Sequence, residues 1–382
     1  MERQTVQLQD LVGDVELFAR RHWGRCPRLQ RAATSTGGGR GEPASRLLSV
    51  ADVDRFLASA PRRPTVRLLR DGAVIEPATY CTRVRLGGQA MTDVVDPVKV
   101  TAAYLAGATV VLQSLHRTWR PVGEVVAGLS AELSHPVQAN AYLTPPEERG
   151  LAAHEDAHDV LVVQCHGTKR WSVAGLGDLS LHPGDVLYLP AGSQHSATTT
   201  DQPSLHLTLG VIPDTVRSIV SQVIDATPDL DRRLPLGYRR RPAADLTPAL
   251  DEALAAARRA LADADPAALA DDVLWSRPAP TVPAATLGAA MAATLGPDAN
   301  LVWRHPADCR LTPAGEGQLL LSFPGGLLRL PDHLAPVLER LAGGEPVPLA
   351  DLADLDPESR LVLARRLAAE GVVDIVPPAP TP

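Results

Sequence analysis

The stretch LAAHEDAHDVLVVQCHGTKRW, residues 151–171, decides how the middle of this chain folds. His154, Glu155 and His158 spell H-E-x-x-H, the zinc-protease signature, which needs a helix so that both imidazoles reach one ion. His154 and Asp156 spell H-x-D, whose two side chains share one face if the segment is a strand. The two hypotheses exclude each other, because one segment cannot be both helix and strand.

The surrounding residues favour the strand. The motif runs directly into DVLVVQ (159–164), a β-branched run that is typical of strands. The loop TPPEERG (144–150) precedes the motif, and neither a metzincin continuation nor a helical glutamate follows it. We therefore expect His154 and Asp156 to point into a β-structure and Glu155 to point away.

A third ligand is expected from a later strand. Between residues 137 and 211, short β-rich runs are separated by Gly, Pro and Asp, the pattern of an antiparallel barrel or sandwich. In LHPGDVLYLPAGSQHSATT (181–199), a turn, a strand and a second turn lead to His195 at the start of a strand. Two histidines and one carboxylate form the facial triad that holds Fe(II) and leaves the opposite face open.

The open face suits a bidentate 2-oxoacid together with O2, and the distal carboxylate of such an acid needs a cation. Lys169, in GTKRW, lies on the expected hairpin return of the same sheet. Arg170 is adjacent and points to the opposite face, so one of the two is expected to bind this carboxylate. Trp171 shares the face of Lys169. A solvated strand lysine is the alternative for Lys169.

Composition limits the class of protein. The chain has 382 residues, of which 45% are hydrophobic, which suits two or three domains. A net charge of −7 gives no reason to expect nucleic acid or an anionic membrane as partner. The four cysteines lie far apart, without a C-x-x-C motif. Because no signal peptide or membrane-spanning run is apparent, we expect a cytoplasmic protein.

The flanking regions are expected to be largely helical. Helical patterns occupy residues 8–27, 96–108 and 122–134, and Ser49 with Asp52 predicts a capped helix over 49–61. These four segments precede the β-rich region.

Two further regions follow the β-rich region. An amphipathic helix is expected over 246–264, after a basic patch at 232–242 that we interpret as a solvated loop. The last part, from about 296, has the pattern of a small winged-helix module. Residues 331–374 hold nine acidic and four basic side chains, so we expect no direct DNA binding.

Several of these stretches resemble the bacterial cupin-like JmjC proteins of the ribosomal oxygenase family. They are NAYLTPP (140–146), GLAAHEDAHDVLVVQCHGTKRW (150–171), GDVLYLPAGSQHSATT (184–199) and PSLHLTLGV (203–211), with FARRHWGRCP (18–27) and VVLQSLHRTW (110–119) similar to the family's N-terminal segments. The resemblance implies an α+β chain. A double-stranded β-helix of the cupin/JmjC jelly-roll type would occupy 1–212 with N-terminal helices, followed by a helical dimerisation region (213–292) and a winged-helix domain (293–382).

The resemblance also implies an activity, namely Fe(II)- and 2-oxoglutarate-dependent hydroxylation of a protein side chain, with an Arg or His of a ribosomal protein as favoured target. By the family pattern, His154, Asp156 and His195 bind iron and Lys169 holds the C5 carboxylate of 2-oxoglutarate. Asn140 and Tyr142, in N-x-Y-L-T, line the cosubstrate and substrate pocket, or they fill the barrel with a hydrogen bond. Family members often have GSQGF where this chain has EERGL (147–151), which changes the substrate mouth.

The remaining histidines of this region are expected to have supporting roles. His158 lies beyond the reach of the metal, beside the ligands, and His206 faces the core near the pocket. His166 is expected at an exposed turn. Two other functions stay open: the same chemistry on a peptide natural product or small molecule, and a dimeric scaffold that binds without turnover.

Overall fold

The computed structural model describes residues 6–32, 42–148, 152–275, 299–304, 309–315, 317–323 and 326–376. The chain splits into two compact units, Met1–Pro213 and Asp214–Pro382. No helix in the described ranges has both the length and the apolar character that a membrane crossing requires.

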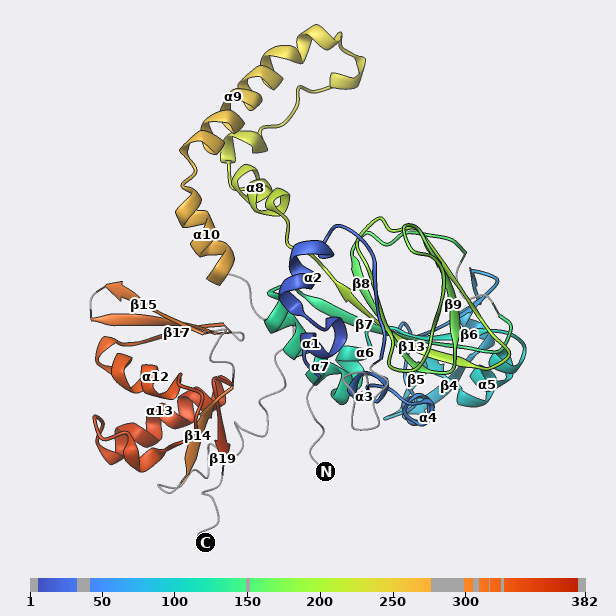
Figure 1. Cartoon of the computed structure of the whole chain (residues 1–382). Helices are drawn as coiled ribbons and strands as arrows, with labels where there is room; N and C mark the ends of the chain where they lie inside the picture. The colour runs from blue at the N-terminus through green and yellow to red at the C-terminus, as the bar shows by residue number, and fades with distance from the viewer. Residues whose placement is uncertain are drawn as a thin grey trace. The chain divides into compact units, whose positions relative to one another are not determined.

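Two antiparallel sheets form the centre of the first unit (Figure 1). Their strands are β1 (Arg28–Gln30), β2 (Val66–Arg70), β3 (Ala73–Val74), β6 (Thr109–Leu112), β7 (Val137–Thr144), β8 (Asp159–His166), β9 (Lys169–Val173), β10 (Gly177–Leu181), β11 (Val186–Leu189), β12 (His195–Thr199) and β13 (Ser204–Val211). In the described part of the chain, the large sheet has the order β1-β11-β8-β13-β7-β6-β2-β3 and the small sheet the order β10-β9-β12. The predicted sandwich of short strands is confirmed.

Strand alternation gives the large sheet two different faces. On β13, Leu205, Leu207 and Leu209 are fully buried in the main core. The residues between them, His206 and Thr208, face the small sheet. Because both faces are covered, the strands at the centre of this sheet are buried along nearly their whole length.

Helices complete the main core on the first face. They are α1 (Leu8–Val12), α2 (Val15–Arg21), α3 (Glu42–Ser45), α4 (Val50–Ala58), α5 (Pro97–Leu105), α6 (Leu115–Thr118) and α7 (Arg120–Leu133), and a separate ribbon is formed by β4 (Cys81–Leu86) and β5 (Gln89–Val95). Each fully buried Leu or Val in such a core contributes roughly 1.5–3 kcal/mol relative to exposure. On the second face, a smaller apolar cluster that includes Val162 and Trp171 joins the two sheets.

The predicted helix cap at Ser49 is confirmed. Its hydroxyl accepts a hydrogen bond from the backbone N–H of Asp52, and the Asp52 carboxylate accepts one from the backbone N–H of Ser49. The single helical segment expected over 8–27 is instead two short helices. Gly13 lies between them with φ +72°, a conformation that ends the first helix.

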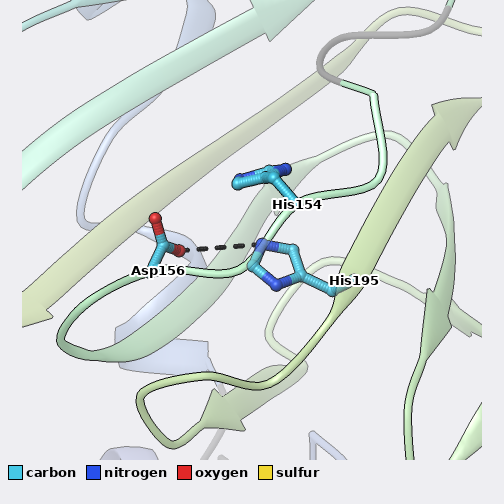
Figure 2. Close-up of side chains that lie close together, drawn as sticks. All are labelled: His154, Asp156 and His195. Carbon is cyan, nitrogen blue, oxygen red and sulfur yellow. Dashed lines mark ion pairs between the residues drawn. The ribbon is translucent and has the colours of Figure 1, made fainter.

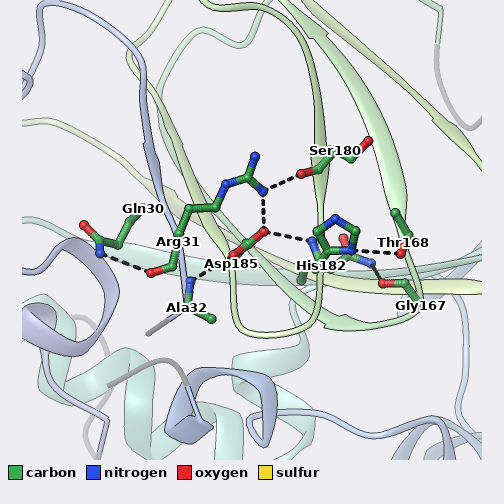
Figure 3. Close-up of polar contacts among 9 residues, drawn as sticks. Gln30, Arg31, Ala32, Gly167, Thr168, Ser180, His182 and Asp185 are labelled. Carbon is green, nitrogen blue, oxygen red and sulfur yellow. Dashed lines mark hydrogen bonds and ion pairs between the residues drawn. The ribbon is translucent and has the colours of Figure 1, made fainter. Parts of the chain in front are cut away.

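Asp185 ties the chain before the sandwich to the turn that precedes β11 (Figure 3). Its carboxylate accepts hydrogen bonds from the Arg31 guanidinium and from the backbone N–H groups of Ala32 and His182. The carboxylate is almost fully buried, so these three donors replace the water that it loses. This network fixes the turn from which the chain continues towards His195.

The second unit contains helices and two small sheets. Its elements include α8 (Val216–Asp225), α9 (Thr247–Asp263), α10 (Pro266–Trp275), β14 (Asn300–Trp303), β15 (Arg310–Gly315), β16 (Gln318–Phe323), β17 (Gly326–Pro331), α12 (Ala335–Leu341), β18 (Val347–Pro348), α13 (Pro357–Ala369) and β19 (Val373–Val376). The predicted amphipathic helix over 246–264 is confirmed as α9. Residues 276–298, across the predicted boundary between the helical region and the winged helix, lie outside the described residues.

Candidate metal centre

A cavity of about 220 Å³ lies between the two sheets of the first unit. The large sheet contributes side chains from β2, β7, β8 and β13, and the small sheet contributes them from β9 and β12. All of the candidate site residues line it, namely Asn140, Tyr142, His154, Asp156, His158, Lys169, His195 and His206. The structure therefore brings the predicted ligands and the predicted pocket residues together in one place.

The side chains of His154, Asp156 and His195, which all line the cavity, lie close together (Figure 2). One ligand atom from each lies within 4.8 Å of the other two, and His195 Nε2 is 3.7 Å from Asp156 Oδ2. Two ligands bound at right angles about 2.1 Å from one ion would be about 3 Å apart. The three side chains thus need only a small contraction to share one ion.

The local backbone explains how the two histidines meet, and it corrects one prediction. Residues 154–158 form neither a helix nor a strand; β8 begins only at Asp159. The backbone groups of His154 and His195 exchange two hydrogen bonds, of 3.0 and 2.8 Å, as an isolated bridge. The carbonyl of Asp156 then accepts from the N–H of Gly192, in the turn before β12, so the ladder stops there.

The absence of a helix makes the zinc-protease hypothesis wrong, since H-E-x-x-H needs helical spacing. The expected alternation nevertheless holds in the extended loop. His154, Asp156 and His158 are partly buried, whereas Glu155 and Ala157 are exposed. The prediction that His154 and Asp156 share an inward face was therefore correct, although the segment is not a ladder strand.

Both imidazoles are oriented in the same way. Nδ1 of His154 lies 2.8 Å from the carbonyl oxygen of Ala152, and Nδ1 of His195 lies 2.8 Å from that of Ser193. A carbonyl oxygen only accepts, so each Nδ1 carries the proton and each Nε2 presents its lone pair to the cavity. Burial also lowers the pKa of His195, which favours the neutral imidazole that binds metals.

Lys169 lies on the opposite sheet from the one predicted. It opens β9, which belongs to the small sheet, because the turn at Gly167 sends the chain from one sheet to the other. Its side chain is 2% exposed, and its Nζ donates to Thr144 Oγ1 at 3.2 Å. Burial lowers the pKa of Lys169 to about 7. Arg170 is exposed, so of the two candidate cations only Lys169 faces the cavity.

Two buried nitrogen atoms of residues that line the cavity have no partner. Among the residues that the structure describes, neither Trp171 Nε1 nor His206 Nδ1 has a hydrogen-bond partner, although both atoms are buried. His206 is stacked on Tyr142, with ring centroids 4.9 Å apart and planes 3° from parallel. Together with the Lys169 ammonium and the Thr144 hydroxyl, these groups fit an oxygen-rich anion beside a divalent ion.

The structure also gives the contacts or exposure of the other predicted residues, Asn140, Tyr142, His158 and His166. Asn140 Oδ1 accepts from the backbone N–H of Ser114, which leaves its amide NH₂ for the cavity. Burial raises the pKa of Tyr142, so its phenol stays protonated at neutral pH.

His158 packs against Gly210, where a Cβ added to Gly210 would lie 2.6 Å from His158 Nε2. His166 is exposed, as predicted.

Arg67 and Thr144 were not recognised from the sequence as cavity residues. Thr144 ends β7 and is fully buried. Arg67 lies on β2, which joins the large sheet only through β6. The available signal was the position of Arg67 between the apolar residues Val66 and Leu68, but this pattern does not say which strands line a cavity.

Comparisons with known proteins agree with this geometry. Residues 124–177 and 174–219 match the family model described as the JmjC domain. The bifunctional lysine-specific demethylase and histidyl-hydroxylase NO66 of Drosophila persimilis is 29% identical over 254 residues, 57% of this chain and 34% of that protein. Ribosomal oxygenase 1 of Gallus gallus is 29% identical over 221 residues, 51% of this chain and 34% of that protein. The chain thus covers about a third of each relative.

Solved structures share the fold. The Escherichia coli ribosomal oxygenase YcfD matches 95% of this chain and 98% of its own, with a TM-score of 0.52 and 17% identity. Its complex with cobalt and 2-oxoglutarate gives a TM-score of 0.51 over 96% of this chain and 99% of that one, also at 17% identity. The two sheets are thus a cupin/JmjC β-sandwich with helices. Residues 124–219 thus match the JmjC domain, and the chain is similar to ribosomal oxygenases in part of its sequence and in its fold.

Proposed function

We propose that this chain is an Fe(II)- and 2-oxoglutarate-dependent oxygenase that hydroxylates a protein side chain, with an Arg or His of a ribosomal protein as favoured target. The observation that carries the proposal is the donor set of one cavity. Two imidazoles with Nε2 lone pairs and one carboxylate lie close together, and a buried lysine lines the same cavity. The names of the relatives, which include a histidyl-hydroxylase and ribosomal oxygenases, support the same activity.

In this proposal His154, Asp156 and His195 hold Fe(II). When bound, the iron and 2-oxoglutarate supply O2 activation coupled to oxidative decarboxylation, which yields succinate. The carbonyls of Ala152 and Ser193 keep both imidazoles in the tautomer that binds metal. The walls contributed by Trp171 and Val162 exclude water from the reacting groups.

Lys169 binds the C5 carboxylate of 2-oxoglutarate in this proposal. It lies on the small sheet, donates a hydrogen bond to Thr144 and lines the same cavity as the triad. Asn140 offers its amide NH₂ to the cosubstrate, and Tyr142 lines the path of the substrate. His158 and His206 support the walls beside the ligands.

The test is succinate formation from 2-oxoglutarate under air with Fe(II), in the wild type, His195→Ala and His166→Ala. His166 is a matched control, because it is an exposed histidine at the end of a strand of the same unit. We expect slow succinate formation in the wild type and in His166→Ala, and none in His195→Ala. Mass spectrometry of ribosomal proteins would then locate the gain of one oxygen.

Anaerobic binding separates a gated enzyme from a scaffold. A wild type that binds Fe(II) and 2-oxoglutarate but forms no succinate needs its substrate for turnover. A wild type that binds neither is not the enzyme proposed here, and the scaffold hypothesis would replace it.

We further propose that residues 1–212 form a double-stranded β-helix domain, that 213–292 form a homodimerisation region, and that 293–382 form a winged-helix domain without direct DNA binding. Exposed apolar side chains on α8 and α9 support the dimer, because such surface usually marks an interface. The acidic balance of residues 331–374 supports the lack of DNA binding. Cys26, Cys81 and Cys165 are free thiols, which supports a cytoplasmic location.

A further inference from the structure

A second cation faces the cavity of the metal centre from the large sheet. Arg67 lies on β2 between Val66 and Leu68, whose side chains are buried in the main core. Strand alternation turns Arg67 to the opposite face, where it lines the cavity together with Leu69. The proposed reaction has no use for this arginine so far, because Lys169 is assigned to the cosubstrate.

The register of the sheet places Arg67 beside Tyr142. Arg67 pairs with Val111 of β6, Val111 pairs with Tyr142 of β7, and Tyr142 pairs with His206 of β13. Two strand spacings, about 10 Å, separate the backbones of Arg67 and Tyr142, and the short side chain of Val111 lies between them. A long arginine side chain can bridge that distance.

Charges near the Tyr142 phenol agree with this placement. Burial raises the pKa of Tyr142, the Arg67 guanidinium lowers it, and the Asp156 carboxylate raises it. The guanidinium and the metal-binding carboxylate are therefore both close enough to the phenol to influence it. A group bound to Arg67 in the cavity would lie near Tyr142, in the same cavity as the triad.

Within the part of the chain that the structure describes, Arg67 lacks the carboxylate partner that other arginines of the first unit have. Its Nε is buried without a hydrogen bond, and within the described ranges it forms no ion pair. By contrast, Arg31 pairs with Asp185, Arg55 with Asp52, and Arg62 with Asp93. An unpaired buried donor costs free energy that an anionic ligand would recover.

The charge of the cavity leaves room for one more anion. Arg67 and Lys169 are its cations, and Asp156 is the carboxylate among its described lining residues. After a divalent ion and a dicarboxylate cosubstrate have bound, one positive charge remains. One additional carboxylate would neutralise it.

We propose that Arg67 is the receptor for a carboxylate of the substrate, so that the segment presented to the metal centre carries an acidic group near the reacting carbon. This inference rests on the proposed function and specifies its substrate class. The planar guanidinium matches a carboxylate with two parallel hydrogen bonds. A target arginine directed at this point would meet like charge, whereas a target histidine with an acidic neighbour would not.

The experiment uses the full chain, labelled with ¹⁵N and loaded with Zn(II) and saturating 2-oxoglutarate. The Nε–H signal of Arg67 is assigned by its disappearance in Arg67→Lys. Three probes are titrated: N-acetylglutamate amide has only the side-chain carboxylate, N-acetylglutamine has only the chain-end carboxylate, and N-acetylglutamine amide has none. We expect a carboxylate probe to shift this signal with about tenfold higher affinity than the neutral probe.

The more effective acidic probe identifies the source of the carboxylate, an acidic side chain or a chain end. Arg70→Gln, an exposed arginine of the same strand, should leave these shifts unchanged. Equal affinity for acidic and neutral probes would overturn the proposal. So would a loss of 2-oxoglutarate affinity in Arg67→Gln, because Arg67 would then serve the cosubstrate.

Calorimetry of Zn(II) and 2-oxoglutarate binding to the wild type tests the proposed function separately. If neither binds while the Arg67 signal still responds to carboxylates, the oxygenase proposal fails and the anion receptor stands. If both bind and the Arg67 signal ignores carboxylates, the receptor fails and the oxygenase proposal stands.

Discussion

Burial strongly changes the chemistry of Lys169. With its side chain 2% exposed, the free ammonium form is disfavoured and the pKa falls from 10.5 to about 7. A carboxylate bound beside it would reverse this effect by stabilising the ammonium. Binding of a dicarboxylate at this position is therefore coupled to the uptake of a proton whenever the pH is above about 7.

We accordingly predict that the affinity for 2-oxoglutarate falls about tenfold per pH unit between pH 7 and 9 in the metal-loaded protein. The pKa of His206, which also faces Lys169, lies well below its usual value, so this imidazole is neutral throughout that range. Calorimetric titrations at several pH values measure the slope.

Two variants check the assignment to Lys169. In Lys169→Arg the guanidinium stays charged, so the slope should disappear. In Lys169→Met the affinity should fall about a hundredfold, while metal binding is kept. A slope of the same size in the wild type and in Lys169→Arg would show that another group titrates.

At the scale of the elements, the turn between β8 and β9 carries the chain from the large sheet to the small sheet. Gly167 has φ +66°, and a Cβ on it would lie 2.0 Å from the carbonyl oxygen of Pro203. Gln164 also donates its side-chain amide to the carbonyls of His166 and Gly167. The turn therefore requires glycine both for its conformation and for its close contact with the backbone before β13.

We predict that Gly167→Ala lowers the free energy of unfolding of the first unit by about 2–5 kcal/mol. Gly177→Ala is the control, because Gly177 has a similar φ of +75° but no atom within 4 Å of the added Cβ. It should cost only about 1–2 kcal/mol, the conformational part. Urea unfolding of both variants gives the comparison, and equal losses would mean that the contact with Pro203 is unimportant.

The strands between residues 137 and 211 could be predicted from the sequence, because they have local signals. The runs at 159–164 and 204–211 are β-rich, and turn residues bound them on either side. His195 could be placed beside His154 because a turn, a strand and a second turn precede it in residues 181–199. This order returns the chain to the region of the H-x-D motif. These signals could be read from the sequence because each of them involves residues that are close together in the chain.

The parts that could not be predicted depend on contacts between distant segments. The sequence contains no local feature that assigns Lys169 to the small sheet, since a two-residue turn can return within one sheet or cross to another. Arg67 enters the cavity only because β6 joins β2 to β7. The same pattern at residues 66–70 would fit a strand with Arg67 in solvent.

In the whole molecule, the two units have separate apolar cores. The main core gathers residues from Val6 to Val211, and the core of the second unit gathers residues from Leu301 to Val373. The helices α8 and α9 have few buried side chains of their own. Leu250 is 51% and Leu254 is 54% exposed, and they lie one turn apart on α9.

If these helices form the proposed homodimer interface, Leu250→Gln with Leu254→Gln should shift the full chain towards the monomer. We expect the dimer dissociation constant, measured by sedimentation velocity over a concentration series, to rise at least about tenfold, because two apolar side chains are lost from each subunit. Leu327→Gln, at a leucine on β17 that is 65% exposed, should leave it unchanged. A wild type that sediments as a monomer at all concentrations would refute the dimer.

The fluorescence of Trp171 should report on metal binding at the triad. Its ring centroid lies 5.9 Å from that of His195, and its side chain is 6% exposed. At such a separation, Co(II) at the triad should quench the indole emission, because its open d shell offers a route for energy transfer. Zn(II), with a filled d shell, should not.

The difference between Co(II) and Zn(II) should therefore vanish in Trp171→Phe. Emission that responds to Co(II) equally in the wild type and in Trp171→Phe would place the ion elsewhere. Because the indole that walls the cavity also reports on it, metal loading can be followed in real time without a dye, a label or a substrate.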